Sequence, residues 1–580
     1  MTLSGNLNCS SACDGIDVLN RGAGTITFSG ATKTLNTSTS TAVNLDNNDA
    51  AQIHFTGGGL DIDTTSGTGF NAVNGAAQVT VQGTGNIIDS VSATALNVSS
   101  TTIGTLGLTF QRISAGNATA AADPASGIVL NTTGTSAGLS VTGTGSAGSG
   151  GTIQATTNAG IALTDTRSIS LDRMIVQNGG DDGIRGDRVN GFALANSTVS
   201  NNGNALDEVG LDFGDGGGAY ASGFVGATGN MSITSTAITG NYHRGVLIRN
   251  KDTAAPFDPL TVSMSGAGCS VTGSTDNNND DGVLVESGES SVIAVSVSGC
   301  SFAANKGDHF QAAALNSGML SVDFTGNTMI GGHPTALGQG VTLNAATGVP
   351  GYLGDIDYDI DGNTSNGSIS NAHAVVMGTS AASASMVGRV RNNIIGTSGA
   401  LLSCSSQANG IYVDARGNAT HTAAVTDNTM RQCFDRGMLS EAGDGDSVLN
   451  LTVTGNISDE QSAVAARESI QTNHGITSTN VFGNVDSNAV CVQLGGAGAL
   501  ANIFSHGGAA PDDFRLRKRQ EATVRLPGYA GGTGQDGVSL GQVVAFIRGQ
   551  NTGSAGEPGS ASASGAGGGY TNGAACPTPP

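Results

Sequence analysis

The chain has 580 residues with 91 Gly, no Trp and 12% charged residues, and its formal net charge is −22. So much Gly is atypical of ordinary globular domains, because each Gly inside a regular element costs about 0.5–1 kcal/mol relative to Ala. The acidic balance disfavours nucleic acid and anionic membrane surfaces as partners, since both require a basic footprint. The hydrophobic content of 38% still suffices for a continuous core, so most of the chain is predicted to be ordered.

Residues 1 to 165 consist of short β-rich strings separated by turns of Gly, Thr, Ser and Asn. The strings at 25–28, 52–55, 78–81 and 139–141 alternate with period two and are too short for helices. This segment is therefore predicted to form the first, short-strand coils of a β-solenoid.

Residues 166 to 490 repeat one phrase, an Asn corner followed by a Gly and an aliphatic residue. Gly183 and Gly210 are 27 residues apart, and Gly245 and Gly282 are 37 apart, which is the spacing of a stacked repeat array. Recurring Asn side chains can form an amide ladder along the axis of such an array. The corners are Asn202, Asn241, Asn327, Asn363, Asn393, Asn428, Asn456 and Asn484, and the other Gly starts are Gly340, Gly410 and Gly437.

The C-terminal part differs from the repeats. Residues 491–550 contain the charged run 514–519 and the apolar string 538–548, and we interpret them as a cap over the open solenoid end. Residues 551–580, rich in Gly, Ser, Ala and Pro, are expected to form a flexible tail. A short helix is expected only at 459–469. The predicted fold is all-β: a right-handed parallel β-helix with a C-terminal cap and flexible tail.

The eight cysteines suggest disulfides. Cys269 and Cys300 are 31 residues apart and Cys404 and Cys433 are 29 apart, about one repeat in each case, so both pairs are expected to stack on adjacent coils within disulfide reach. Cys9 and Cys13 form a plausible local pair, and Cys491 and Cys576 are left over. This spacing favours an oxidising compartment, with buried free thiols as the alternative. The absence of a Cys-x-x-Cys pair argues against structural zinc.

The sequence shows no secretory signal at its start and no run of 18 apolar residues. If the protein is exported, we expect the chain to be a segment of a larger precursor, located outside the cell or on the bacterial surface. No direct membrane insertion is expected in this segment.

Four short motifs have more ordinary explanations. Gly134–Gly138 fits the G-x-S-x-G pattern but lacks a following helix, and Gly143–Gly148 fits a dinucleotide fingerprint but reads as a turn. Arg185-Gly186-Asp187 is a single match to an integrin-recognition tripeptide. Asp357, Asp359 and Asp361 resemble the start of a calcium loop, but Ser368 replaces the bidentate Glu, and alternation favours a strand with one solvated face.

The strongest catalytic candidate is the pair Asp181 and Asp182. Glycosidases need two carboxylates across the sugar bond, and Asn178–Asp182 is similar to the paired Asp of polygalacturonase-type glycosidases. However, Asp280-Asp281-Gly282 repeats the phrase, so the pair belongs to the architecture. We therefore assign no catalytic, cofactor-binding or metal-binding residues and no cofactor.

Several phrases resemble giant bacterial surface proteins of the β-strand-repeat, or right-handed parallel β-helix repeat, type; these phrases are residues 27–36, 55–69, 307–316 and 523–529. The resemblance spans essentially the whole chain and implies a secreted or displayed β-helix without implying any catalytic residue.

We therefore expect a secreted or surface-displayed, adhesin- or passenger-like scaffold that binds extracellular protein, matrix or glycan ligands. A purely structural stalk is a further possibility, and the enzymatic alternative is a polysaccharide-degrading glycosidase or lyase using Asp pairs. Any specific function is expected where the repeat phrase breaks, at 205–225, at 250–260, at 308–310 or in the cap.

Overall fold

The structure is a computed structural model of the whole chain, in which nearly all regular structure is β-strand. It describes all residues except 11–12, 120–121, 216–222, 252–257, 274–279, 332–337, 346–353, 369–372, 377–383, 460–466, 477–486, 506–511, 554–560 and 566–567. Its contacts divide it into two compact units. Unit 1 comprises residues 1–252 and 258–277, and unit 2 comprises residues 253–257 and 278–580.

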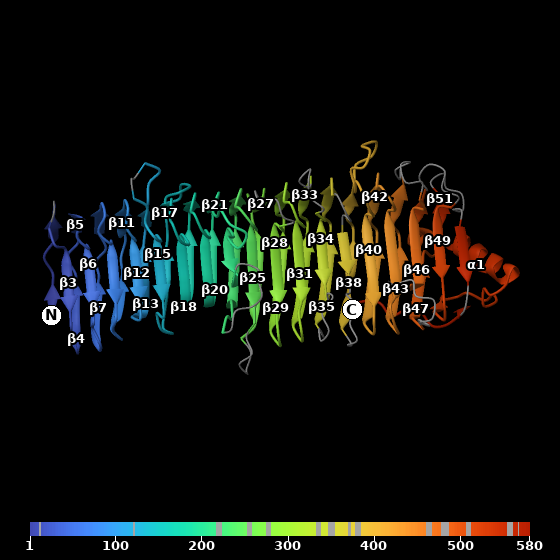
Figure 1. Ribbon diagram of the computed structural model, residues 1–580, viewed down its shortest axis with the longest axis horizontal. Coiled ribbons are helices and arrows are strands. Elements are labelled where there is room, and N and C mark those ends of the chain that lie inside the picture. The colour runs from blue at the N-terminus through green and yellow to red at the C-terminus, as the bar shows by residue number, and fades with distance from the viewer. Residues whose placement is uncertain are drawn as a thin grey trace. The chain divides into compact units, whose positions relative to one another are not determined.

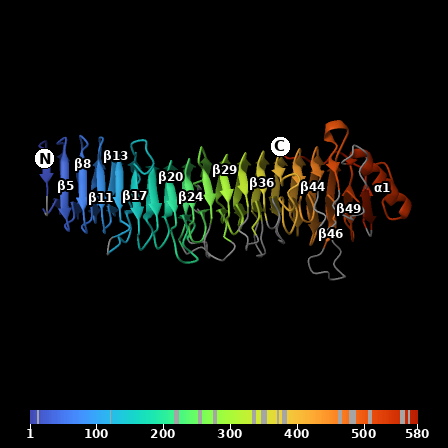
Figure 2. The same cartoon turned by 90° about the horizontal axis from the view of Figure 1, so that it is seen from above.

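Each unit is a stack of coils, and a coil contributes one strand to each of three faces (Figures 1 and 2). In unit 1, β7 (Ala51–Phe55), β8 (Leu60–Thr64) and β9 (Phe70–Val73) pair in parallel with β10 (Gln78–Val81), β11 (Ile87–Ser90) and β12 (Leu96–Ser99) of the next coil. Parallel pairing on three faces defines the predicted parallel β-helix. Parallel crossovers almost always wind to the right, which is the predicted hand.

Unit 2 keeps the same plan on its three faces. One face contains β40 (Ile411–Arg416), β43 (Met438–Gly443), β46 (Ile470–Ile476), β49 (Phe514–Lys518) and β52 (Ala561–Gly565). The second contains β32 (Met319–Thr325), β35 (Asp355–Asp361), β38 (Ser385–Arg391), β41 (Thr420–Thr426), β44 (Val448–Thr454), β47 (Ala489–Leu494), β50 (Thr523–Arg525) and β53 (Gly569–Thr571). The third includes β45 (Ile457–Asp459), β48 (Ile503–Phe504) and β51 (Thr552–Gly553).

The core lies inside the coils, because alternate residues of each strand point inward. In unit 1, Phe28 stacks on Phe55 at 4.7 Å between ring centroids, and Phe55 contacts Phe70 edge-on at 5.6 Å. Each predicted Gly start precedes a strand, as Gly183 precedes β20 (Ile184–Ala195). A Cβ at Gly183 would lie 2.5 Å from the Gly210 carbonyl oxygen, so Gly permits this close approach of neighbouring coils.

The predicted Asn ladder is confirmed at every described corner. In unit 2, Asn393 Nδ2 donates to Asn428 Oδ1 at 2.8 Å and to the Ile360 carbonyl at 2.9 Å, and its Oδ1 accepts from Asn363. Asn484 lies outside the described residues. The ladder instead continues from Asn456 to Asn502 and then to Asn551. The repeat phrase did not reveal Asn502 or Asn551. Coil length varies too widely for a fixed period, from 23 residues between Asn178 and Asn201 to 49 between Asn502 and Asn551.

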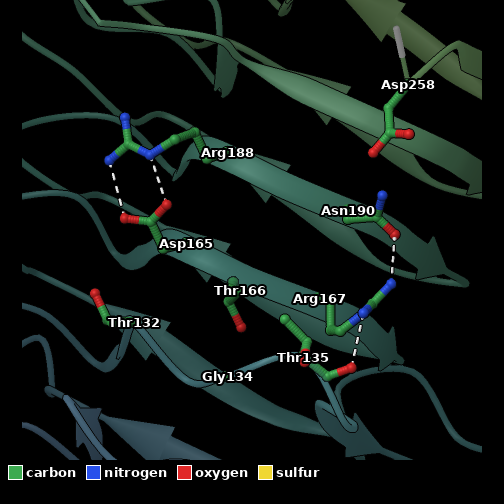
Figure 3. Close-up of a pocket in the computed structure, with 9 residues that line it drawn as sticks. All are labelled: Thr132, Gly134, Thr135, Asp165, Thr166, Arg167, Arg188, Asn190 and Asp258. Atoms are coloured by element: carbon green, nitrogen blue, oxygen red, sulfur yellow. Dashed lines mark hydrogen bonds and ion pairs between the residues drawn. The ribbon is translucent and has the colours of Figure 1, made fainter. Parts of the chain in front are cut away.

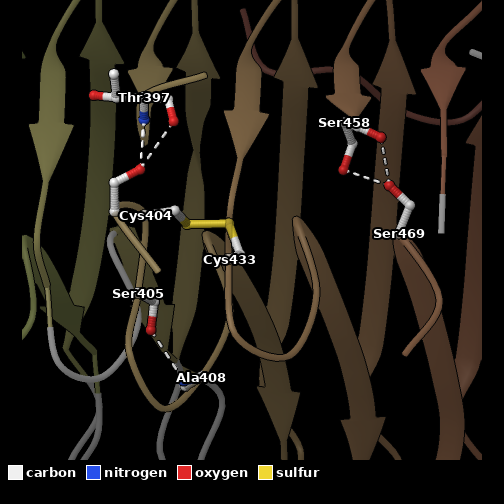
Figure 4. Close-up of a disulfide and its surroundings, with 8 residues drawn as sticks. Thr397, Cys404, Ser405, Ala408, Cys433, Ser458 and Ser469 are labelled. Atoms are coloured by element: carbon white, nitrogen blue, oxygen red, sulfur yellow. Dashed lines mark hydrogen bonds between the residues drawn. A yellow bond between two sulfur atoms is a disulfide. The ribbon is translucent and has the colours of Figure 1, made fainter. Parts of the chain in front are cut away.

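Both units contain disulfides, and none of the cysteines in the described residues is free. The predicted Cys9–Cys13 and Cys404–Cys433 bonds are present, the latter between adjacent coils (Figure 4). Cys491 and Cys576, which the sequence left over, are bonded to each other across a separation of 85 residues. The Cys269–Cys300 pairing, between residues of different units, stays a prediction.

Two expectations about the C-terminal part differ from the structure. The described residues of 459–469 do not form the expected helix, since Asp459 ends β45. A helix is found instead at α1 (Gly537–Gln550). Asp536 caps it, and the Asp536 side chain accepts from Ser539 N at 2.7 Å. The described parts of the expected flexible tail are ordered. Strands β52 and β53 pair with β49 and β50, and Tyr570 is buried. The preceding coil offers unpaired backbone groups, and a segment of small residues can pair with them through its own backbone.

The last residues turn back along unit 2 after Cys576. Figure 1 shows the C-terminal end beside β38, several coils before the strands that precede it in sequence. Arg389 of β38 donates to the carbonyl oxygen of Pro579 at 3.1 Å and also to that of Pro580.

The Asn ladder should carry a measurable share of stability. We expect Asn393→Ala to leave buried amide and carbonyl groups unpaired and to destabilise unit 2 by about 1–3 kcal/mol, measured by urea unfolding. Thr325→Ala, on the outer edge of β32, is the control and should shift stability by less than about 0.5 kcal/mol. Equal shifts for the two variants would contradict a structural role for the ladder.

Candidate functional site

The predicted Asp181–Asp182 pair is built into a joint between two coils of unit 1. Asp182 has no exposed surface, and its Oδ1 accepts from Val209 N of the next coil at 2.6 Å. Burial, followed by the nearby Asp212 carboxylate, raises the pKa of Asp182 above its usual range. The side chain of Asp181 accepts from the backbone of Asp182 at 2.8 Å. This arrangement serves coil stacking, and a fully buried carboxylate cannot reach a sugar.

The same hydrogen bond between coils recurs in unit 2, at the second Asp-Asp pair and at residues 308–310, where the repeat phrase breaks. Asp281 Oδ1 accepts from Asp308 N at 2.9 Å, and Asp308 Oδ1 accepts from Gln339 N at 2.8 Å. Next to it, burial lowers the pKa of His309 to about 4, and Asn305 Nδ2 lies 3.1 Å from its Nδ1. The 308–310 departure is therefore part of the packing.

The other short motifs have structural roles. Arg185-Gly186-Asp187 lies within β20, where Asp187 accepts from the backbone of Val225 and Gly226 at 3.0 and 3.2 Å. The turn that contains Ser136 leads into β16 (Leu139–Val141) rather than a helix, which removes the nucleophile-elbow geometry. Residues 143–148 form a turn, as expected.

The calcium-like Asp series forms alternate residues of β35, as the strand interpretation predicted. Asp359 and Asp361 both pair with Arg391, at 2.7 and 3.2 Å. Across the described ranges, no group of three or more His, Cys, Asp or Glu side chains is placed to hold a metal ion.

Unit 1 carries an open groove of about 440 Å³ where two long strands turn a corner (Figure 3). The strands are β18 (Ile161–Asp172) and β20, which pair along most of their length. Asp165 and Arg188 adopt left-handed φ values of 47° and 52° and so turn both strands at the same level. The lining residues are Thr132, Gly134, Thr135, Asp165, Thr166, Arg167, Arg188, Asn190 and Asp258.

Polar contacts hold the floor of this groove, which we call the Arg167–Arg188 groove. Arg188 forms two hydrogen bonds with Asp165, at 2.5 and 3.0 Å. Arg167 bridges three coils by donating to the Thr135 carbonyl at 2.7 Å and to Asn190 Oδ1 at 3.3 Å (Figure 3). The result is a pre-organised concave surface of guanidinium, amide and hydroxyl groups.

Unit 2 carries a largely buried cluster of polar and charged residues at β40 and β43, formed by Tyr412, Asp414, Arg416, Glu441 and, just after β43, Asp444. We call it the β40–β43 charge cluster. Arg416 contacts all three carboxylates, at 2.8 Å to Asp414, 2.7 Å to Glu441 and 3.0 Å to Asp444. The Tyr412 hydroxyl donates to Glu441 at 2.8 Å. Parallel register places Asp414 directly opposite Glu441.

The electrostatics of this cluster resemble those of acid–base sites. Burial raises the pKa of Asp414 to about 7, although Arg416 opposes the shift. Asp414 therefore exchanges a proton near neutral pH while it lies beside a second carboxylate. Perturbed carboxylates occur at catalytic sites and also in structural ion-pair networks, so the cluster is a candidate of either kind.

Comparisons with models of protein families, with curated proteins and with solved structures gave no match to this chain. The site assignment therefore rests on geometry and chemistry. In the described residues, no helix is long and apolar enough to cross a membrane.

Sequence reasoning did not find the groove or the β40–β43 charge cluster. The groove combines residues from four coils, and no local motif marks it. One sequence signal for the charge cluster exists in residues 411–416, where the alternate positions carry Tyr, Asp and Arg instead of the usual Thr, Ser or Asn. Of the expected breaks, 216–222 and 252–257 lie outside the described residues.

The buried Asp182 should give unit 1 a distinctive pH dependence. Because the folded-state pKa lies above that of the unfolded chain, its stabilising contribution is complete below about pH 4 and is lost as the pH rises. We expect Asp182→Asn, which keeps the acceptor for Val209, to reduce the loss of stability between pH 5 and 8. Urea unfolding at both pH values measures this, with Asp181→Asn as the control. Identical pH slopes for Asp182→Asn and the unchanged protein would contradict the prediction.

Proposed function

We propose that the chain is a secreted or surface-displayed β-helix scaffold of the adhesin or passenger type, which binds extracellular glycan or matrix ligands. The observation that carries the proposal is the Arg167–Arg188 groove, a polar concavity of about 440 Å³ on an otherwise regular array of coils. Ligand sites combine such concavities with a few convergent polar groups.

Three further features support this proposal. The predicted Asp pairs serve as coil joints, which removes the earlier basis for catalysis. The disulfides fit an oxidising compartment outside the cell. The resemblance to giant bacterial surface proteins of the β-helix repeat type points to the same setting.

Blocking the groove should weaken binding. We expect the whole chain to bind at least one ligand in a screen of immobilised glycans and matrix proteins. Thr135→Trp, which puts a bulky ring at the exposed edge of the groove, should weaken that binding at least tenfold without unfolding unit 1. Thr65→Trp, at an exposed turn outside the groove, is the control. Silence across the screen would overturn the proposal, and undiminished binding by Thr135→Trp would overturn the assignment of the groove.

A second candidate function is the cleavage of polysaccharide at the β40–β43 charge cluster. Asp414, whose pKa lies near 7, and the adjacent Glu441 favour it, because general acid–base cleavage needs a proton donor and an acceptor. Cleavage there requires the Asp414 carboxyl, which is 4% exposed, to open toward the bound sugar.

This candidate predicts release of new sugar ends from a polysaccharide. Asp414→Asn and Glu441→Gln should each lower the rate by about 10²- to 10⁴-fold. If Asp414 acts as the acid, activity should fall as the pH rises through about 7, because the carboxyl loses its proton. The control is Asp359→Asn, which removes a carboxylate on another face of unit 2. No cleavage across a polysaccharide panel would eliminate the candidate.

A further inference from the structure

The charged residues that line the Arg167–Arg188 groove are accessible and balance one another. Two are the arginines that name the groove, and the other two are Asp165 and Asp258. The side chains of Arg188 and Asp165 are 38% and 41% exposed, and Asp258 is exposed as well. A ligand that enters the groove therefore reaches these groups and meets a lining without net charge, in a chain whose net charge is −22.

The charge of Arg188 is already used within the protein. Its Nε and Nη2 donate to the two oxygens of Asp165 at 2.5 and 3.0 Å. Its Nη1 donates to Asp187 and, at 3.0 Å, to the Gly223 carbonyl oxygen. Two carboxylates thus share one guanidinium. An acidic ligand beside Arg188 would lie against both carboxylates, and like charges in contact disfavour binding.

Arg167 supplies hydrogen-bond donors that are held in place by uncharged groups. It donates to the Thr135 carbonyl oxygen at 2.7 Å and to Asn190 Oδ1 at 3.3 Å (Figure 3). Asn190 is fixed in turn, because its Nδ2 donates to Thr228 Oγ1 at 3.1 Å. A guanidinium has five N–H groups, and these hydrogen bonds use two of them. Since Arg167 is only half-buried, the rest can donate to oxygen atoms of a ligand.

Asp165 supplies acceptors next to these donors. Its two carboxylate oxygens have about four lone-pair positions, of which the bonds from Arg188 use two. The remaining positions can accept from hydroxyl groups, because the Asp165 side chain is accessible. Thr135, which is exposed, adds a hydroxyl and a methyl group to the same lining. Donors and acceptors side by side suit a ligand rich in hydroxyl groups, because each hydroxyl both donates and accepts.

The groove runs along the stack of coils. Thr132 and Thr135 follow β15 (Ile128–Asn131), which pairs with β18, and β18 pairs with β20. The lining from Thr132 to Asn190 therefore comes from three successive coils. Coils are about 4.8 Å apart, so this part of the groove extends about 10 Å along the stack. An extended chain of linked units can lie along it and repeat the same contacts from coil to coil.

We propose that the Arg167–Arg188 groove binds an uncharged glycan, whose hydroxyl groups donate to Asp165 and accept from Arg167. The inference rests on the proposed function and names the class of glycan. The strongly acidic chain repels a polyanionic glycan at long range, and the balanced lining offers it no compensating attraction. A polycationic glycan is attracted by the acidic surface in general, so this groove gives it no preferred position.

Calorimetric titration of the full chain tests the proposal. The probes are neutral cello-, malto- and manno-oligosaccharides, with acidic oligogalacturonate and cationic chitosan oligosaccharide for comparison. We expect at least one neutral oligosaccharide to bind with an affinity that does not change as salt is added, because no charge on the ligand is screened. Oligogalacturonate should not bind detectably, and any binding of chitosan oligosaccharide should disappear at high salt.

Two variants test the roles of the side chains. Arg167→Leu removes the donors and should raise Kd for the neutral oligosaccharide roughly 10-fold. Asp165→Asn suits the left-handed backbone at this position, because Asn tolerates it. This change deprives Arg188 of a carboxylate partner, so it should weaken binding of the neutral oligosaccharide about 3- to 10-fold and give oligogalacturonate a measurable affinity.

The matched control is Asp89→Asn, which removes a carboxylate from another Arg–Asp pair of unit 1, outside the groove, and should leave all affinities unchanged. Urea unfolding establishes that each variant keeps its fold. The inference is overturned if no neutral oligosaccharide binds, or if both Arg167→Leu and Asp165→Asn bind it as the unchanged protein does. If oligogalacturonate or a matrix protein binds instead, and Thr135→Trp weakens that binding, the inference fails while the proposed function stands.

Discussion

Backbone hydrogen bonding between successive coils is the interaction on which the rest of this structure depends. Every strand is completed by the strands before and after it in the stack, so residues one coil apart occupy equivalent positions. A side chain that suits one coil must also suit its neighbours. At the corners this requirement is met by Asn, whose amide both donates and accepts along the axis, as in the run from Asn327 to Asn551. The buried amides of these corners are thereby hydrogen-bonded to one another and to backbone carbonyls.

The same constraint explains why the carboxylate pairs serve the fold. Where a turn leaves a backbone N–H of the next coil without a strand partner, a carboxylate can accept from it. Asp182, Asp281 and Asp308 all do so at equivalent positions. Asp182 is kept there although burial disfavours its charged form. Repetition of the Asp-Asp-Gly phrase is thus a property of coil joints, and a catalytic role would require exposure that these residues lack.

Function is free to appear on the outward side chains, because stacking restricts them less than the inward ones. Most outward positions carry Thr, Ser or Asn, which suits long uniform faces. The Arg167–Arg188 groove and the β40–β43 charge cluster depart from that pattern.

The sequence by itself determined the architecture. The Asn corners, the Gly starts and two of the cysteine pairs are confirmed, because stacking equivalent residues leaves a repeat that can be read from spacing alone. It could not place Asn502 and Asn551, since coils of varying length break the period. Nor could it place the last coil, because the composition of residues 551–580 suggests flexibility. These residues are ordered by strand pairing with β49 and β50 and by the Cys491–Cys576 disulfide. Only the tertiary structure decided the candidate sites, because Arg167 and Asn190, or Arg416 and Glu441, are far apart in sequence and meet only through the register of adjacent coils.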